Sequence, residues 1–222
     1  MFLNPADKSF RAFLFDLDGT VVDTIDLIRE SFRHASREVL GRQLPDEVLM
    51  ANVGQPLMEQ MEKLGAKKAG QLYDTYRRYN HAHHDELIRS YPGVEDLLKE
   101  LGMRGVRLGI VTSKSRDTVK MAFHSIPVEP YFDTVVAADD TDFHKPHPQP
   151  LMLAMRRLDA ALDETVYIGD SPFDIKAGQA AGIATAGVGW GIFPPQRLKE
   201  LEPDFYFEKP DEILSLCPVR NV

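Results

Sequence analysis

Short apolar runs recur along the chain, and the first of them, Ala12 to Phe15, stops abruptly at Asp16. Uninterrupted apolar runs of about four to eight residues are typical of strands that are buried on both faces of a parallel sheet. The pattern predicts five such strands. They cover 12–15, 108–111, 134–137, 165–168 and 183–188.

Segments with helical periodicity separate these runs. Over 94–103, apolar residues recur at the spacing that places them on one face of a helix. Strands that alternate with helices predict an α/β fold, here a Rossmann-like doubly wound parallel sheet with helices on both faces. The other predicted helices are one that follows Ser115 as N-cap, one over 148–158, and one over 174–181 that Gly182 ends.

The segment between Val22 and Ser90 breaks this alternation, because it contains no convincing strand. Its apolar spacing predicts helices over 24–40, 46–64 and 66–88, the second broken near Gly54 and Pro56. We interpret the segment as a helical cap inserted after the first strand. The predicted domains are a catalytic core of 1–21 and 91–222 and a cap of 22–90.

Composition excludes several classes of partner. The net charge of −8 and the lack of long basic runs argue against binding to nucleic acid. No apolar run approaches the roughly 20 residues that span a bilayer, so no membrane partner is expected. Cys217 is the one cysteine and the segment 1–10 does not resemble a signal peptide, which favours a cytoplasmic protein. Monomer and homodimer both remain open.

The end of the first predicted strand carries the clearest chemical signal. Asp16 and Asp18 leave the strand together, and Gly19 permits a tight turn after them. One carboxylate could attack phosphorus and become an aspartyl phosphate. The other could protonate the leaving oxygen and then deprotonate the hydrolytic water. Two aspartates in a loop are common, so the pair needs support from elsewhere in the chain.

Polar residues at three other strand ends give that support, because the carboxyl ends of parallel strands meet at one edge of the sheet. Thr112 and Ser113 offer hydroxyl and N–H groups to a phosphate at the start of a helix. Lys145 could neutralise the phosphate. Asp170 and Asp174 are hard oxygen ligands suited to Mg²⁺.

In this order, the four segments resemble the four motifs of the haloacid dehalogenase superfamily, and the insert lies at the position of its cap. The resemblance covers 11–191 and implies phosphohydrolase activity through an aspartyl-phosphate intermediate, with Mg²⁺ as cofactor and a small phosphorylated substrate. It also implies the site residues. They are Asp16 as nucleophile, Asp18 as acid and base, Thr112 (favoured) or Ser113 as the phosphate-binding hydroxyl, Lys145 as the phosphate lysine, Asp170 as metal ligand together with Asp16 and the Asp18 carbonyl, and Asp174 as support or further ligand.

Within the superfamily, the second aspartate argues against a dehalogenase. The whole chain resembles the phosphoglycolate phosphatase group, and the cap segments 53–59 and 76–86 resemble the bacterial inorganic pyrophosphatase subgroup. Phosphoglycolate and pyrophosphate are therefore the favoured substrates. The cap loop at Gly54 and Gln55 is expected to bind the leaving group, with Arg77, Arg78 and Arg89 as candidate cations.

Other interpretations remain open. A sugar-phosphate phosphatase or phosphomutase of the same superfamily is the main alternative, and a non-catalytic phosphate-binding module is disfavoured because the nucleophile and metal carboxylates are all present. His81 and Asp85 have the spacing of a helical metal site, but a solvated helix face or packing at the cap hinge explains them better.

Overall fold

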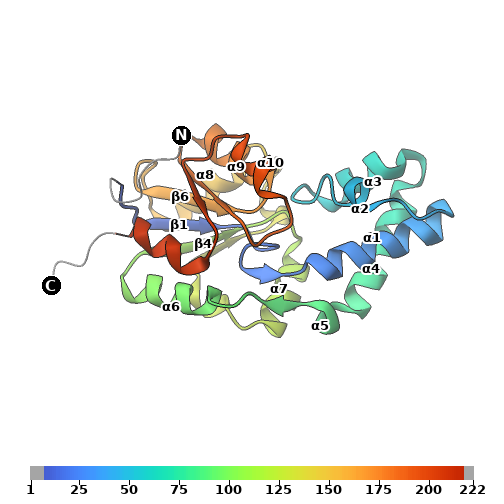
Figure 1. Ribbon diagram of the computed structural model, residues 1–222, viewed down its shortest axis with the longest axis horizontal. Coiled ribbons are helices and arrows are strands. Elements are labelled where there is room, and N and C mark those ends of the chain that lie inside the picture. Colours follow the sequence, from blue (N-terminus) through green and yellow to red (C-terminus); the bar gives the residue numbers. More distant parts are fainter. Residues whose placement is uncertain (1–7, 218–222) are drawn as a thin grey trace.

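The computed structural model describes residues 8–217, so most of the segment 1–10 lies outside the described residues. A six-stranded parallel sheet forms the core, in the order β5-β4-β1-β6-β7-β8 (Figure 1). When only these six strands are numbered along the chain, their order is 3-2-1-4-5-6, which is the strand order of the Rossmann fold. The predicted fold class is therefore confirmed. The strands are β1 (Ala12–Phe15), β4 (Arg107–Val111), β5 (Thr134–Val136), β6 (Thr165–Gly169), β7 (Ala184–Val188) and β8 (Phe205–Phe207).

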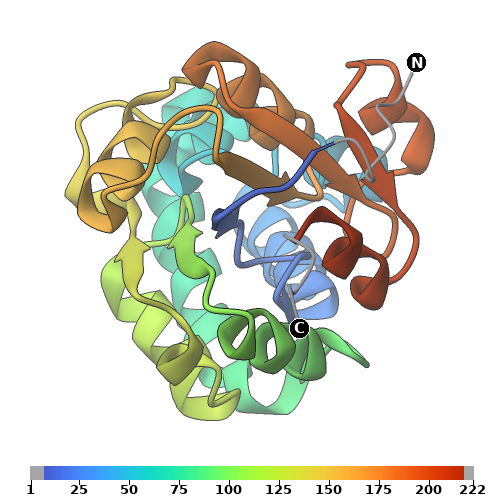
Figure 2. The same ribbon diagram turned by 90° about the vertical axis from the view of Figure 1, so that its left-hand side faces the viewer.

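Helices cover both faces of this sheet (Figure 2). On one face, residues of α8 and α9 pack against Leu14, Val111 and Tyr167. On the other, α6, α7 and η5 pack against Phe13, Ile110 and other strand residues. The core helices are α6 (Val94–Met103), α7 (Arg116–Ser125), η3 (Glu129–Tyr131), η4 (Ala138–Asp140), α8 (Gln149–Leu158), α9 (Pro172–Ala181), α10 (Pro195–Lys199) and η5 (Pro210–Leu216).

The sequence pattern missed β8, the sixth strand. It has only three residues and lies at the sheet edge, where Phe205 and Phe207 alternate with the half-buried Tyr206. So short a run carries too little periodicity to be separated from a loop. The helix predicted over 174–181 begins two residues earlier, because α9 starts at Pro172 with Ser171 as its N-cap.

The inserted segment forms a helical layer beside the carboxyl end of the sheet (Figure 1). Its own core includes Ile28, Phe32, Leu72 and Tyr76, where α1 and α4 pack against each other. The predicted break near Gly54 is confirmed by a loop over 50–56. The elements are α1 (Ile25–Leu40), α2 (Asp46–Leu49), α3 (Leu57–Gly65), η2 (Ala66–Lys68), α4 (Ala69–Ala82) and α5 (His84–Leu87).

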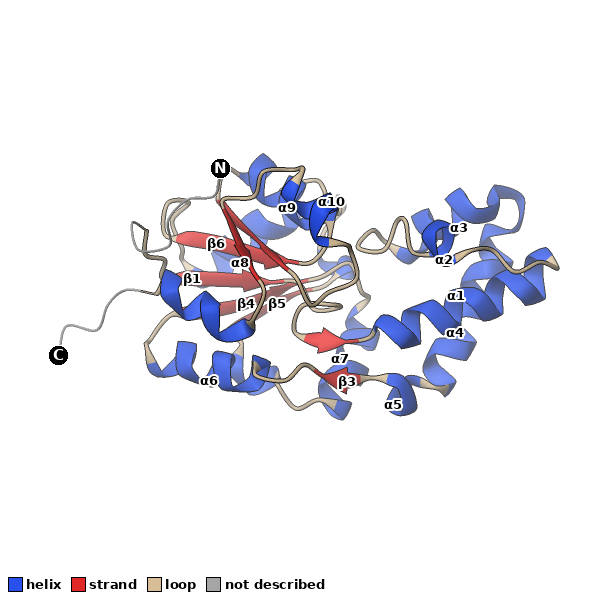
Figure 3. Cartoon of the chain, in the orientation of Figure 1, coloured by secondary structure: helices blue, strands red, loops and turns tan. Residues whose placement is uncertain are grey.

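A short antiparallel ribbon connects the core with the inserted helical layer (Figure 3). It pairs β2 (Val22–Asp23) with β3 (Arg89–Ser90). The expectation of no strand between 22 and 90 is therefore wrong at both ends, because strands of two residues show no periodicity. The domain boundaries at 21/22 and 90/91 stay a prediction. In the part of the chain that the structure describes, no helix is both long and apolar enough to cross a bilayer.

Candidate active site

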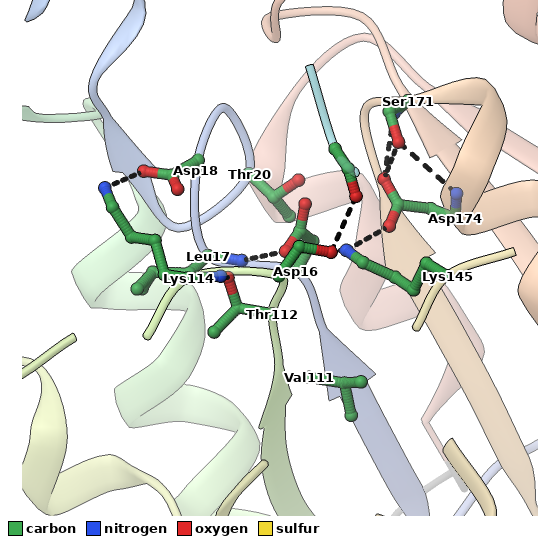
Figure 4. A network of polar contacts seen from close by, with 12 residues as sticks. Asp16, Leu17, Asp18, Thr20, Val111, Thr112, Lys114, Lys145, Ser171 and Asp174 are labelled. Atoms are coloured by element: carbon green, nitrogen blue, oxygen red, sulfur yellow. Dashed lines mark hydrogen bonds and ion pairs between the residues drawn. The ribbon is translucent and has the colours of Figure 1, made fainter. Parts of the chain in front are cut away.

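Asp16 follows directly on β1, the strand that pairs with both β4 and β6. The strand order reverses between β1 and β6, so Asp16 lies at the switch point where ligands bind in such sheets. Its side chain is 4% exposed. Oδ1 accepts hydrogen bonds from the N–H of Leu17 at 2.8 Å and forms an ion pair with Lys145 Nζ at 3.0 Å. These two contacts fix the carboxylate in one orientation (Figure 4).

Burial raises the pKa of Asp16 to about 7; Lys145 opposes this rise, whereas Asp174 and Asp18 add to it. Lys145 is also buried, and its Nζ donates to Asp174 Oδ1 at 2.7 Å and to the hydroxyl of Tyr167 at 3.1 Å. Burial alone would lower the pKa of Lys145, but the carboxylates of Asp16 and Asp174 raise it above its ordinary value. Lys145 is therefore a fixed positive charge beside the predicted nucleophile.

Asp174 serves as an acceptor for several donors at once. Oδ1 accepts from Lys145 and from Tyr167 at 2.9 Å. Oδ2 accepts from the N–H of Ser171 at 3.0 Å and from its hydroxyl at 2.6 Å. Because both oxygens are engaged, the geometry favours Asp174 as a support for Lys145 over a role as a direct metal ligand.

Asp170 follows β6 and lies next to Asp16. Oδ2 accepts from the N–H of Ile192 at 2.6 Å, while Oδ1 accepts from Thr20 at 3.4 Å. Burial raises the pKa of Asp170 well above its usual value, with Asp174 and Asp16 adding to the rise. Gly19 has φ +78° and lies so close that a Cβ there would be 2.2 Å from Asp170 Oδ2. This close approach explains the glycine.

The three buried carboxylates fit a divalent cation. Asp16, Asp170 and Asp174 each offer an oxygen, and these atoms lie within 4.8 Å of one another. Lys145 compensates one of the three negative charges. The two negative charges that remain are the number that one Mg²⁺ would balance. Carboxylate oxygens are also the ligand type that Mg²⁺ prefers. Since Asp174 is engaged, Asp16 and Asp170 are the better-placed ligands.

Asp18 turns away from this cluster. Its Oδ1 accepts from the hydroxyl of Thr24 at 2.6 Å and forms a close ion pair with Lys114 (Figure 4). The Asp18 side chain is therefore not part of the carboxylate cluster, and the predicted use of its backbone carbonyl stays a prediction. To reach a leaving oxygen, the Asp18 carboxylate must exchange these two partners for the substrate.

Thr112 and Ser113 differ in what their hydroxyls contact. Thr112 is buried, and its Oγ1 accepts from the N–H of Lys114 at 3.2 Å. The hydroxyl of Ser113 donates to the carbonyl of Gly54 in the cap loop at 2.7 Å. This contact commits Ser113 to the cap and supports Thr112 as the phosphate-binding hydroxyl. Ser115 is the N-cap of α7 as expected, although its hydroxyl contacts Thr118.

A cavity of about 240 Å³ lies between the core and the inserted layer. The strand-end residues form its floor, and residues 53–56 of the loop, the start of α3 and one face of α4 form its opposite wall. Gly54 and Gln55, both expected to bind the leaving group, lie in this wall. The core residues that line the cavity include Asp16, Asp18, Thr112, Ser113, Lys114, Asp170 and Ser171.

The family model of haloacid dehalogenase-like hydrolases matches residues 13–188, a span that holds every strand-end residue described above. The chain belongs to this family. The expectation of a hydrolytic enzyme of the phosphatase type is thereby confirmed. Phosphatases of this family generally use Mg²⁺, in keeping with the three buried carboxylates.

Known members of the family cover nearly the whole chain. Pyrophosphatase PpaX of Anoxybacillus flavithermus is 40% identical over 213 residues, 96% of this chain and 99% of the relative. PpaX of Bacillus velezensis is 41% identical over 214 residues, with the same coverage. A Lactobacillus plantarum structure, provisionally named a phosphoglycolate phosphatase, has a TM-score of 0.84 and 28% identity, covering 94% of this chain and 99% of its own. Both resemblances predicted from the sequence are confirmed.

The structure adds polar residues that the sequence did not single out. Lys114 contacts Asp18. Its place in the sequence, directly after the two hydroxyl residues at the end of β4, could have indicated that it belongs to the site. Tyr167 lies within β6, where its position among apolar residues hid a hydroxyl that contacts Asp174 and also lies 2.9 Å from the carbonyl oxygen of Val111. Nothing in the local sequence distinguishes Thr24 from an ordinary helix N-cap.

Several candidates outside the strand ends contact other residues of the protein. Arg77 lines the cavity, but Arg78 is exposed and contacts Thr75, and Arg89 contacts the carbonyl of Ile88. The amide of Gln55 contacts Glu59 and Lys63. Among residues 8–217, the three aspartates are the only group of three or more potential metal ligands, so the metal interpretation of the His81 and Asp85 pair receives no support.

Proposed function

We propose that this protein is a Mg²⁺-dependent phosphohydrolase that acts through an aspartyl phosphate on Asp16. Inorganic pyrophosphate is the leading substrate, and phosphoglycolate is the rival. The observation that carries this proposal is the position of Asp16. It lies on the floor of a small cavity and is held through Oδ1 by Leu17 and Lys145.

Each chemical step has a residue suited to it. Asp16 attacks phosphorus, the bond to the leaving oxygen breaks, and Asp18 supplies the proton that this oxygen takes up. Asp18 then removes a proton from water, which attacks the phosphorus and releases Asp16. Thr112 and the N–H groups before α7 hold the transferred group, whose negative charge Lys145 balances. A bound Mg²⁺ supplies charge neutralisation for the phosphate oxygens near Asp16 and Asp170.

The size of the cavity supports a small substrate. At about 240 Å³ it is below the range of about 300–1,000 Å³ that holds drug-sized ligands. A sugar-phosphate phosphatase or phosphomutase would need room for a hexose, which makes this alternative weaker. The PpaX relatives support pyrophosphate because they match over nearly the full length, cap included. The Lactobacillus plantarum neighbour supports phosphoglycolate as the rival.

The test is phosphate release from pyrophosphate, phosphoglycolate and 4-nitrophenyl phosphate at matched free Mg²⁺, with EDTA as a control. We expect kcat/KM to be highest for pyrophosphate and activity to vanish in EDTA. Asp16→Asn should lower kcat by several orders of magnitude, because loss of a covalent nucleophile can cost about 10⁶. Near-normal turnover by Asp16→Asn, checked for deamidation, would refute the mechanism. A much higher kcat/KM for a sugar phosphate would refute the substrate.

A further inference from the structure

One face of α4 forms the cavity wall opposite the catalytic carboxylates. Its lining residues are Tyr73, Tyr76, Arg77, Asn80 and His81, which recur at helical spacing. Arg77 lies at the centre of this set and is half-buried. Its NH1 donates to the hydroxyl of Tyr73 at 3.1 Å, and its NH2 contacts His81 Nε2 at 3.2 Å. The guanidinium is thus held from both sides, four residues before and four after it.

Both groups that hold Arg77 are uncharged. An arginine can only donate, so Nε2 of His81 must accept, and the ring carries its proton on Nδ1. Burial lowers the pKa of His81, as do Arg77 and His84, while Asp117 opposes this shift. This shift is in the direction that the acceptor role of Nε2 requires. Tyr73 is a neutral hydroxyl. Within residues 8–217, Arg77 forms no ion pair with a carboxylate, whereas Arg33 in the same layer pairs with both Glu30 and Asp46.

The other cations at the cavity are already engaged. Lys145 is buried beneath the floor between Asp16 and Asp174, and Lys114 pairs with Asp18. Arg77 is consequently the one permanent cation in the described cavity wall that lacks an anionic partner. Because this charge faces the cavity that holds the catalytic residues, it is suited to an anionic part of the ligand.

The direction of the reaction decides which part of the substrate meets Arg77. In phosphoryl transfer the attacking and leaving oxygens are roughly in line. Because Asp16 attacks from the floor, the leaving group extends towards the opposite wall, where α4 lies. A guanidinium there can bind a phosphate or a carboxylate through two parallel hydrogen bonds.

We propose that Arg77 is the specificity-determining residue for an anionic group on the leaving side of the substrate, and that Tyr73 and His81 position it. This inference rests on the proposed function and deepens it. The anion is the second phosphate of pyrophosphate or the carboxylate of phosphoglycolate. An aryl phosphate has neither, so its turnover should depend little on Arg77.

The test compares Arg77→Gln with Arg78→Gln, which removes the same charge from the next residue of α4 but outside the cavity. We expect Arg77→Gln to lower kcat/KM about 10- to 100-fold for the substrate with the anion, as loss of a charge-assisted contact implies, and at most about threefold for 4-nitrophenyl phosphate. Arg78→Gln should match the wild type on all three substrates. Tyr73→Phe, which keeps the ring, should give a smaller loss with the same selectivity.

A binding measurement separates failure of this inference from failure of the proposed function. Methylenediphosphonate, a non-hydrolysable pyrophosphate analogue, is tested as an inhibitor of 4-nitrophenyl phosphate turnover at matched free Mg²⁺. We expect its inhibition constant to rise about 10-fold or more in Arg77→Gln and to stay unchanged in Arg78→Gln. If pyrophosphate is a poor substrate but this difference appears, the substrate proposal fails and the anion site stands. Equal inhibition of all variants, or equal losses on all substrates, would overturn the role of Arg77.

Discussion

At the scale of single residues, the site pairs almost every charge with a specific partner. Lys145 contacts Asp16 and Asp174, and Lys114 contacts Asp18. The carboxylate of Asp18 contacts Thr24 and Lys114, and it does not share the Lys145 ion pairs of Asp16 and Asp174. This separation suits a general acid and base, whose side chain must turn towards the substrate. The fixed carboxylate of Asp16 suits a nucleophile, which must keep one orientation.

The acid role of Asp18 can be tested by changing the leaving group. Asp18→Asn should lower kcat for pyrophosphate by about 10²–10⁴-fold, the usual contribution of general acid–base catalysis. For 4-nitrophenyl phosphate the loss in the first step should be smaller, because nitrophenolate leaves without a proton. Burst kinetics would measure that step separately from hydrolysis of the aspartyl phosphate.

A matched control for this change is Asp139→Asn. Asp139 lines the same cavity, but its carboxylate accepts from the N–H of Arg116 at the start of α7. We expect this variant to retain activity with both substrates. An equal loss in the burst for good and poor leaving groups in Asp18→Asn would contradict the acid role.

At the scale of elements, the cap loop rests directly on the catalytic strand ends. Gly54 has φ +103°, its carbonyl accepts from Ser113, and a Cβ there would lie 2.8 Å from Ser171 Oγ. Ser171 in turn holds Asp174. The loop therefore contacts residues that follow two different strands, β4 and β6, so the position of the loop is coupled to both strand ends.

Gly54→Ala should disturb this contact, since it adds both backbone strain and a collision with Ser171. We expect kcat/KM to fall about 10-fold or more, and stability to fall by about 1–2 kcal/mol from the left-handed backbone. Gly41→Ala is the matched control: Gly41 also has a positive φ, of 68°, but no atom lies within 4 Å of its added Cβ. It should lose similar stability in thermal melts yet keep its activity. Equal activity in the two variants would remove the loop from catalysis.

At the scale of the whole molecule, the buried negative charge makes stability depend on pH and metal. The pKa of Asp16 rises from 3.8 to about 7 on folding, and that of Asp170 is also raised, in both cases mainly by burial. A carboxyl with a raised pKa contributes stability that is complete below its unfolded pKa and is lost as pH rises through its folded pKa. The metal-free protein should therefore lose stability between about pH 4 and about pH 7 from Asp16, and further from Asp170.

Bound Mg²⁺ should restore this stability. The effect should be larger at high pH, because there protons do not compete with Mg²⁺ for the carboxylates of Asp16 and Asp170. We expect saturating Mg²⁺ to raise Tm by about 5–10 °C near pH 8 and by clearly less near pH 5. Asp170→Asn should raise Tm of the metal-free protein near pH 8 and abolish most of the Mg²⁺ effect. A Mg²⁺-induced shift that is the same at both pH values, or is retained in Asp170→Asn, would contradict this account.

The sequence by itself determined the alternation of five of the six core strands with helices, because four-residue or longer apolar runs and helical periodicity are local properties of the chain. It also indicated the strand-end residues that the structure brings to one edge, since parallel strands carry their carboxyl ends to the same place. The short strands β2, β3 and β8 escaped prediction because pairing with a distant partner, and not local pattern, defines them.

Only the tertiary structure decided which neighbours each side chain meets. Thr112 and Ser113 are equivalent in sequence, but Ser113 contacts the cap loop while Thr112 stays at the cavity floor. Arg77 and Arg78 are adjacent arginines, but successive residues of α4 are rotated by about 100° about the helix axis, and only Arg77 lines the cavity. Both distinctions depend on the packing of the cap against the core, where the contacting residues lie far apart in the chain. Local sequence fixes which groups are available, and packing fixes which of them meet the substrate.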